Sequence, residues 1–173
     1  MDLRDYIADI PDYPREGIVF KDITPLFLDA GALRQTVDEL SDYAKQLDVE
    51  FVVFAEACGF MLGAAVAAHV GAGFIPARKP GKLPREVNSV EYVLEYGVDA
   101  LEVHKDALAG GARVLVHDDL LATGGTAKAL CELVEQLDGQ VVACGFLIEL
   151  AFLQGRENLA GYGVRALLRF DSE

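Results

Sequence analysis

Two adjacent carboxylates precede a loop of small residues in the middle of the chain. Asp118 and Asp119 follow an apolar run, and Ala122-Thr123-Gly124-Gly125-Thr126 comes shortly after them. A loop with little side-chain bulk can close its backbone N–H groups around a phosphate at a helix N-terminus, and its two threonine hydroxyls add donors. The carboxylates would repel that phosphate, so we expect them to accept hydrogen bonds from ribose hydroxyls beside it. The pattern predicts a site for a ribose phosphate.

A simpler interpretation is a strand-to-helix connection that uses Asp and Thr as helix caps. It accounts for one Asp and one Thr, but not for two acids followed by Thr-Gly-Gly-Thr. The loop is not a Walker A motif, because no Lys-Ser/Thr pair follows its glycines. Gly71-Ala72-Gly73 lacks the third glycine of a dinucleotide fingerprint and precedes a strand.

A cluster of cations is the second candidate for a site. The chain has a formal net charge of −13, which argues against a nucleic-acid or membrane partner. The stretch from Ala57 to Arg85 nevertheless contains no Asp or Glu, and it ends in a group of four cations: Arg78, Lys79, Lys82 and Arg85. This group predicts a site for a small anion, and a solvated basic loop is the alternative.

These residues must be positioned by alternating strands and helices. Apolar residues at alternating steps of four and three predict an amphipathic helix over residues 32–47. Short apolar runs, typical of buried parallel strands, occupy residues 51–55, 73–77, 113–117, 141–150 and 164–170. Further helices are expected over residues 59–70, 126–137 and 153–159.

The alternation predicts a single α/β domain with a mostly parallel sheet flanked by helices on both faces. A loop over residues 80–88 and two strands, 90–94 and 100–104, form an excursion from this pattern. Ligands of such sheets bind beyond the carboxyl ends of the strands. The turns after Ala55, Ala77 and His117 are therefore the expected site.

Length and cysteine content limit the class of protein. A chain of 173 residues suits one domain with a full core. The three cysteines, Cys58, Cys131 and Cys144, form no CxxC pair, which disfavours a disulfide framework or a zinc site. The three histidines lack ligand-like spacing. The N-terminus has no signal-peptide plan and no apolar run is long enough to span a bilayer, so we expect a cytoplasmic protein.

Five ordered segments resemble type I phosphoribosyltransferases. The stretch VHDDLLATGGT is similar to their motif for phosphoribosyl pyrophosphate (PRPP), in the form found in adenine phosphoribosyltransferases. Residues 12–26 resemble the base-binding segment, 77–84 the basic loop, 94–97 the mobile loop and 148–156 the C-terminal signature. The resemblance covers nearly the whole chain.

The resemblance implies a fold and an activity. It implies one phosphoribosyltransferase domain over residues 1–173, with a base-binding hood (1–28), basic and mobile loops (78–104) and a PRPP-binding strand-loop-helix (113–137). The implied reaction is purine salvage, in which adenine and PRPP give AMP and pyrophosphate. Hypoxanthine, guanine or xanthine as the base, or a non-catalytic PRPP- or nucleotide-sensing regulator, are alternatives.

The resemblance also implies a cofactor and an assembly. Mg²⁺ would be held mainly by pyrophosphate and ribose oxygens of the substrate, with no strong ligand from the protein, as is usual for this ion. A homodimer is implied as well.

Roles for single residues follow from the same resemblance. Phe20 would pack on the base, and a core aromatic is the alternative for it. Glu95 of the mobile loop would handle a proton on the purine ring, or would be a solvated loop residue, and Tyr96 would cover the site. The remaining implied contacts are Ala122–Thr126 to the 5-phosphate, Asp118 and Asp119 to the ribose, Ala57, Cys58, Arg78, Lys79 and Lys82 to pyrophosphate, and Val19, Lys21 (both through backbone) and Leu150 to the base.

One position departs from the family pattern. Residues 56–60 resemble the pyrophosphate loop, which normally carries Arg where this chain has Cys58. Loss of a guanidinium removes a bidentate phosphate contact, so we expect weaker PRPP binding unless Arg85 or Lys79 compensates. No histidine can be placed beside Cys58 to make it a nucleophile.

Overall fold

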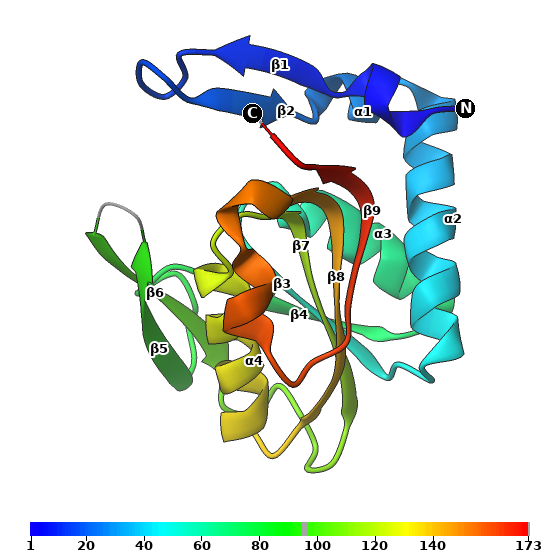
Figure 1. The fold of residues 1–173 in the computed structure, drawn as a ribbon. Coiled ribbons are helices and arrows are strands. Elements are labelled where there is room, and N and C mark those ends of the chain that lie inside the picture. The colour runs from blue at the N-terminus through cyan, green and yellow to red at the C-terminus, as the bar shows by residue number, and fades with distance from the viewer. Residues whose placement is uncertain (95–96, 173) are drawn as a thin grey trace.

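The computed structural model describes residues 1–94 and 97–172 (Figure 1). The chain opens with a short 3₁₀ turn, η1 (Leu3–Tyr6), and an antiparallel hairpin of β1 (Ala8–Pro11) and β2 (Val19–Asp22). Helix α1 (Thr24–Leu28) leads from the hairpin into the long helix α2 (Ala30–Gln46). Figure 1 shows the hairpin standing over the rest of the molecule, at the end of α2 where that helix begins. We call the β1–β2 hairpin the hood.

The body is built on a five-stranded parallel sheet. Its strand order is β4-β3-β7-β8-β9. Val53 of β3 pairs with Ile75 on one side and with Val116 on the other. Such continuous apolar strands form because both faces of the sheet are covered. The strands are β3 (Phe51–Ala55), β4 (Gly73–Ala77), β7 (Arg113–Leu121), β8 (Gln140–Leu150) and β9 (Val164–Phe170).

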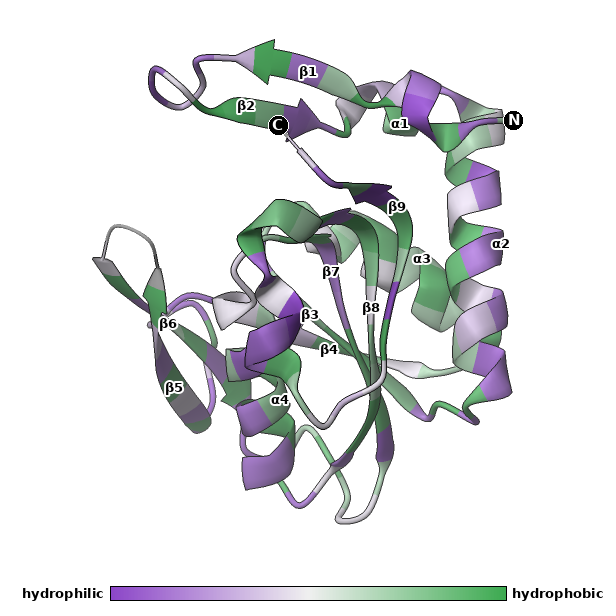
Figure 2. Ribbon diagram, viewed as in Figure 1, coloured by the Kyte–Doolittle hydropathy of each residue, from purple (hydrophilic) through white to green (hydrophobic). Residues whose placement is uncertain are grey.

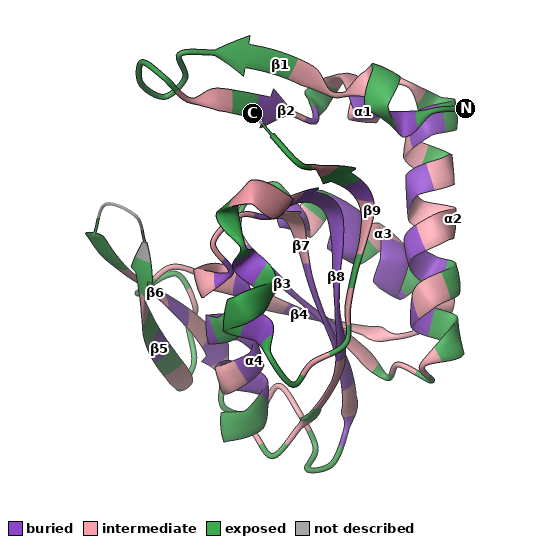
Figure 3. Cartoon of the chain, in the orientation of Figure 1, coloured by how far each residue is buried: buried purple, intermediate pink, exposed green. Residues whose placement is uncertain are grey.

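Helices cover both faces of this sheet and create two hydrophobic cores. Helices α2 and α3 (Gly59–Val70) pack on one face, where Leu40, Phe54 and Leu62 are buried. Helix α4 (Gly125–Gln136) packs on the other face, where Leu130 and Phe146 are buried. Figure 2 shows the hydrophobic residues concentrated in the strands, and Figure 3 shows the same strands as the most buried part of the body.

A second antiparallel hairpin leaves the body between β4 and β7. It consists of β5 (Val87–Leu94) and β6 (Gly97–His104) and forms its own two-stranded sheet. Leu101 and Val103 of β6 are buried in the same core as α4. A backbone bridge between Arg78 and Glu102 ties the hairpin to the end of β4.

The two edges of the parallel sheet are built differently. Each strand is entered, at the amino edge, through a tight turn that contains a residue with positive φ. These residues are Asp48 (49°), Gly71 (76°), Gly111 (80°), Asp138 (57°) and Gly161 (97°). The connections that leave the carboxyl edge carry the residues singled out in the sequence.

The predicted body agrees closely with the structure. The strands at 51–55, 73–77 and 164–170 and the helix at 59–70 have the expected bounds. The mostly parallel sheet with helices on both faces is confirmed. Among the described residues, no helix is both long and apolar enough to cross a membrane.

Several predicted bounds were wrong: β6 begins at Gly97 rather than at residue 100, and α2 spans Ala30–Gln46 rather than residues 32–47. Three further differences have a clear cause. Strand β7 continues past His117 to Leu121, because Asp118 and Leu120 still pair with β8. Strand β5 begins at Val87, inside the stretch predicted as loop, because it pairs with β6 from there on. The helix expected over residues 153–159 is two 3₁₀ segments, η2 (Ala151–Leu153) and η3 (Gly155–Leu159), separated by Gln154, whose φ of 55° interrupts a helix.

Candidate active site

The carboxyl ends of β3 and β7 bring two candidate loops together. These strands are neighbours in the sheet, so the loops that follow them lie side by side. A Cβ atom added to Gly59, at the start of α3, would lie 3.0 Å from Oδ1 of Asp118. The acidic pair and the 56–58 loop are therefore parts of one site.

Asp118 and Asp119 share a poorly hydrated position at the end of β7. The backbone N–H of Asp119 donates to Oδ1 of Asp118 at 3.0 Å. Loss of solvent contact, and then the charge of Asp119, raise the pKa of Asp118 well above its usual value. Loss of solvent contact also raises the pKa of Asp119. Ligand hydroxyls that donate hydrogen bonds to these two groups would favour their ionised form and so offset the loss of solvent contact.

The small-residue loop forms a cradle at the start of α4. Residues 120–127 line a cavity of about 100 Å³. Helix α4 begins at Gly125, and the N–H groups of its first turn have no partner within the helix. Gly124 has a φ of 86°, and a Cβ there would lie 2.4 Å from the carbonyl oxygen of Gly155. A larger residue at this position would clash, so the tight cradle requires glycine.

The 56–58 loop presents Cys58 beside the acidic pair. Cys58 is exposed and precedes the first residue of α3. Partial desolvation, followed by the charges of Asp119, Asp118 and Asp22, raises the pKa of its thiol. The thiol therefore stays protonated, which agrees with the expectation that it is no nucleophile.

Glu56 binds the start of the basic loop. Its Oε2 accepts hydrogen bonds from Nε (3.2 Å) and Nη2 (3.0 Å) of Arg78, and its Oε1 accepts the backbone N–H of Lys79 at 2.5 Å. The Lys79 N–H is the main cause that lowers the pKa of Glu56. Glu56 is not among the residues predicted for the site, although it directly follows the strand that ends at Ala55.

The other cations of the cluster diverge. Nζ of Lys79 forms an ion pair with Asp99 of β6, and Lys82 is exposed. Arg85 contacts Asp106 at 2.6 Å and Nδ1 of His104 at 3.1 Å. His104 is five residues beyond Asp99 on β6, about 16 Å at strand spacing. The structure thus groups Arg78 and Lys79 with the 56–58 loop and places Arg85 apart.

The hood offers an aromatic surface for a base. Phe20 is 43% exposed, which excludes the alternative of a core aromatic. The Tyr13 ring meets it edge-on, with ring centroids 5.3 Å apart. Both rings, with Ile10 and Asp22, line a cavity of about 280 Å³. Tyr13 was missed as a candidate because only its segment, not its side chain, was singled out.

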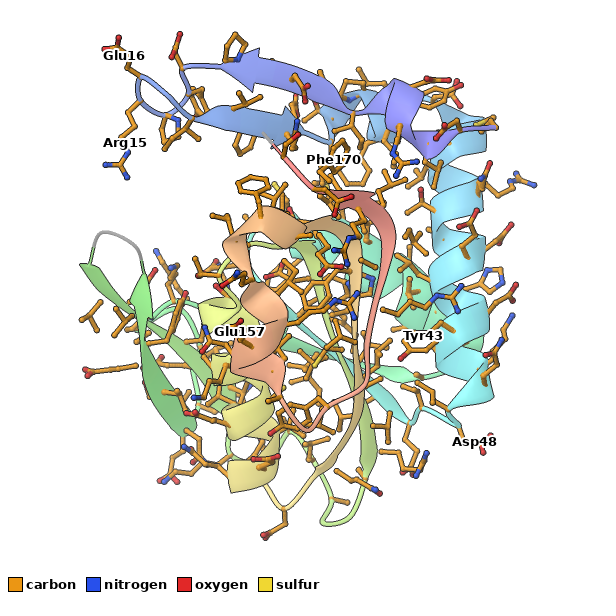
Figure 4. The ribbon with its side chains drawn as sticks, in the orientation of Figure 1. Arg15, Glu16, Tyr43, Asp48, Glu157 and Phe170 are labelled. Atoms are coloured by element: carbon orange, nitrogen blue, oxygen red, sulfur yellow. The ribbon has the colours of Figure 1, made fainter. Side chains whose placement is uncertain are left out.

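Lys21 points away from that cavity. Its side chain is buried, its Nζ forms an ion pair with Asp9 at 2.7 Å, and the same atom lies 4.7 Å from the ring centroid of Phe170. Figure 4 shows Phe170, near the end of β9, beneath the hood. Only the backbone of Lys21 is therefore available to a base in the cavity, and its contact with a base stays a prediction.

Of the remaining predicted residues, the structure describes Leu150 but not Glu95 or Tyr96. Leu150 is the last residue of β8 and is half-buried at the carboxyl edge of the sheet. Glu95 and Tyr96 lie outside the described residues, so their roles stay predictions.

A larger cavity lies elsewhere. It has a volume of about 660 Å³ and is lined mainly by apolar side chains of α2 and α3, among them Leu33, Val37 and Met61. It contains none of the predicted site residues, so cavity size does not locate the chemistry in this molecule.

The site has few protein ligands for a metal. Within residues 1–94 and 97–172, no group of three or more His, Cys, Asp or Glu side chains is placed to hold a metal ion. Asp118 and Asp119 are two oxygen donors beside the cradle, and Mg²⁺ commonly combines one or two carboxylates with substrate oxygens and water. The donor set fits an ion that arrives with a phosphorylated substrate.

Comparisons with known proteins agree with this geometry, although no family model matches the chain. The adenine phosphoribosyltransferase of Rubrobacter xylanophilus is 56% identical over 169 residues, which cover 97% of this chain and 91% of that protein. The crystal structure of the enzyme from Thermoanaerobacter pseudethanolicus has a TM-score of 0.94 and 49% identity, and covers 97% and 98% of the two chains.

A third relative was solved with ligands. The Saccharomyces cerevisiae adenine phosphoribosyltransferase, in complex with adenine and an imino-altritol bisphosphate, is 38% identical, has a TM-score of 0.90 and covers 96% of each chain. Because sequence and fold agree over almost the full length of these proteins, this chain belongs to the adenine phosphoribosyltransferase family of enzymes.

Proposed function

We propose that this chain joins adenine to the ribose 5-phosphate of PRPP, giving AMP and pyrophosphate, at the carboxyl edge of its parallel sheet. The observation that carries the proposal is the pair Asp118–Asp119 directly beside a small-residue cradle at the start of α4. Family membership favours adenine over hypoxanthine, guanine and xanthine, and favours an enzyme over a regulator. The yeast relative crystallised with adenine and a sugar bisphosphate supports the same substrate classes.

The acidic pair and the cradle would fix the sugar. Backbone N–H groups of residues 122–126 would bind the 5-phosphate, while Asp118 and Asp119 accept hydrogen bonds from the ribose hydroxyls. As a purine nitrogen attacks the anomeric carbon and pyrophosphate departs, the sugar gains positive charge. Carboxylates held close to the ring would stabilise that charge.

The 56–58 loop and the basic loop would receive the pyrophosphate. Ala57 and Cys58 can supply backbone N–H groups, and Arg78, Lys79 and Lys82 supply positive charge. Glu56 orients Arg78 through two hydrogen bonds. Mg²⁺, held mainly by pyrophosphate and ribose oxygens of the substrate, would neutralise the leaving group.

The hood and the mobile loop would complete the site. Adenine would pack on Phe20 in the hood cavity, with its polar edge against the backbone of Val19 and Lys21 and with Leu150 along the wall. Glu95 would handle the purine proton and Tyr96 would help exclude water, since PRPP hydrolyses if water enters. Assembly as a homodimer and a cytoplasmic location belong to the same proposal.

A purine panel tests the proposal. The chain is incubated with PRPP, Mg²⁺ and adenine, hypoxanthine, guanine or xanthine, and both pyrophosphate and nucleotide are measured. We expect AMP from adenine and little product from the other bases. Binding of PRPP without nucleotide formation from any purine would instead support the regulator, and light scattering of the same sample gives the assembly state.

A further inference from the structure

The segment η3, which follows β8, lies against the phosphate cradle. Its first two residues, Gly155 and Arg156, end the C-terminal signature noted in the sequence (148–156), of which the proposed mechanism uses only Leu150. Figure 1 shows these turns next to the start of α4, at the carboxyl edge of the sheet. The proposed mechanism therefore gives η3 no role of its own.

Two glycines allow the segment to meet the cradle backbone to backbone. A Cβ added to Gly155 would lie 2.2 Å from the carbonyl oxygen of Ala122, and one added to Gly124 would lie 2.4 Å from the carbonyl oxygen of Gly155. Real side chains never approach backbone so closely, so no larger residue fits at either position without displacing the loop.

Asn158 adds a side-chain contact on the same loop. Its Nδ2 donates a hydrogen bond to the carbonyl oxygen of Thr123 at 2.7 Å. Its Cβ would lie 3.1 Å from a Cβ on Gly124. Asn158 therefore fixes the orientation of the Thr123–Gly124 peptide group, whose N–H belongs to the cradle.

An ion pair between the buried Glu149 and the exposed Arg156 fixes η3 itself. Glu149, whose side chain is 4% exposed, accepts hydrogen bonds from Nε (2.6 Å) and Nη2 (2.7 Å) of Arg156. Nη1 of Arg156 donates to the carbonyl oxygen of Val164 at 3.0 Å. Because Glu149 lies on the rigid strand β8, the pair holds η3 to the sheet.

We propose that Asn158 is a positioning residue for PRPP, which holds the phosphate cradle in its binding shape from outside the site. Gly155 makes room for that contact, and the Glu149–Arg156 pair anchors it. The inference rests on the proposed function, because the cradle must bind the 5-phosphate for its shape to matter.

Asn158→Ala tests the proposal, with Glu157→Ala as the matched control. Glu157 is the neighbouring, exposed residue of η3, labelled in Figure 4, and its side chain has no hydrogen bond or ion pair to any described residue. Loss of one hydrogen bond should raise the KM for PRPP and the Kd for ribose 5-phosphate roughly three- to tenfold. The KM for adenine and the thermal midpoint should stay at the wild-type values, as should all four quantities in Glu157→Ala.

A second variant gives a graded response. Gly155→Ala places a methyl group against the Ala122 carbonyl, so its effect on ribose 5-phosphate binding should exceed that of Asn158→Ala. Wild-type affinity in Asn158→Ala would overturn the inference, and so would equal losses for PRPP, adenine and thermal stability, which indicate a merely structural role.

Different results would refute the proposed function and this inference. Absence of nucleotide from every purine in the wild type would refute the proposed function. In that case the Kd for ribose 5-phosphate, measured by calorimetry, can still be compared between Asn158→Ala and the wild type. If the wild type does not bind ribose 5-phosphate, both the proposed function and this inference are refuted.

Discussion

At the scale of single residues, the acidic pair combines two needs that conflict. Asp118 and Asp119 must be ionised to accept hydrogen bonds from the ribose hydroxyls, yet loss of solvent contact raises both pKa values, and the charge of Asp119 raises that of Asp118 further. A raised pKa means that protonation begins at a higher pH than for an ordinary aspartate. PRPP binding should therefore weaken on acidification earlier than exposed carboxylates would require.

This conflict predicts a pH-dependent KM for PRPP. We expect the wild-type KM to rise as pH is lowered through the acidic range, because the acceptor form of the pair is lost. Asp119→Asn should raise the KM at neutral pH and flatten its pH dependence, whereas the KM for adenine should change little. Initial rates across this range measure both effects, and an unchanged slope in the variant would contradict the assignment.

Cys58 gives a second prediction at this scale. Arg78 and Lys79 already have carboxylate partners, and Arg85 lies apart, so none of them replaces a guanidinium at position 58. Cys58→Arg should lower the KM for PRPP at least about tenfold, since a charge-assisted hydrogen bond contributes roughly 1.5–3 kcal/mol. Cys58→Ser, which adds no charge, is the control. No improvement in Cys58→Arg would disprove the prediction.

At the scale of elements, strand β7 carries an unusual buried histidine. His117 is fully buried, stacks on Phe54 with ring centroids 4.2 Å apart, and donates from Nδ1 to the Asp118 carbonyl oxygen at 2.8 Å. Its Nε2 has no hydrogen-bond partner among the described residues. Burial lowers the pKa of His117 to about 3, so the ring is neutral in the folded chain.

The lowered pKa predicts a loss of stability in acid. Below about pH 6.5 His117 is protonated in the unfolded chain, whereas in the folded chain it stays neutral down to about pH 3. Between these two values the free energy of unfolding falls by up to ~1.4 kcal/mol for each pH unit of acidification. His117→Leu should remove this contribution. Urea unfolding of both proteins at several pH values tests this prediction. Asp118 and Asp119 titrate in both proteins, so their contribution cancels when the two are compared. Parallel curves would contradict the prediction.

The hood depends on an aromatic contact with the end of β9. Two cations contact the ring of Phe170: Nζ of Lys21 lies 4.7 Å and Cζ of Arg4 lies 6.0 Å from its centroid. Phe170→Leu should loosen the hood and raise the KM for adenine severalfold, since such contacts contribute about 0.5–2 kcal/mol. The KM for PRPP should not change, and Phe170→Tyr, which keeps the ring, should behave as wild type. A change in both KM values would show that the ring supports the whole body.

The elements of the body could be predicted, whereas the contacts between them could not. Buried parallel strands are continuous apolar runs, so β3, β4 and β9 are evident in the sequence. The end of β7 was missed because Asp118 and Asp119 look like the start of a loop, although they pair with β8. Glu56 with Arg78 and Asn158 with Thr123 join residues 22 and 35 positions apart. No local pattern encodes such pairs.

At the scale of the whole molecule, metal should matter for the reaction and not for the fold. The described residues offer no cluster that could hold an ion without substrate. Removing Mg²⁺ with a chelator should therefore abolish AMP formation and leave the thermal midpoint of the free protein unchanged. Calorimetry with and without chelator measures the second effect. A lower midpoint after chelation would reveal a structural ion.

The contrast between the two edges of the sheet has a practical consequence. The loops that carry the acidic pair, the cradle and the basic residues leave the carboxyl edge, while the turns at Asp48 and Asp138 lie at the other edge. Residues inserted next to Asp48 or Asp138 would therefore lengthen an exposed turn and leave the proposed ligand contacts unchanged. Those turns are suitable places to attach a fluorophore or a fused domain, and a chain labelled there should bind its substrates as the unlabelled chain does.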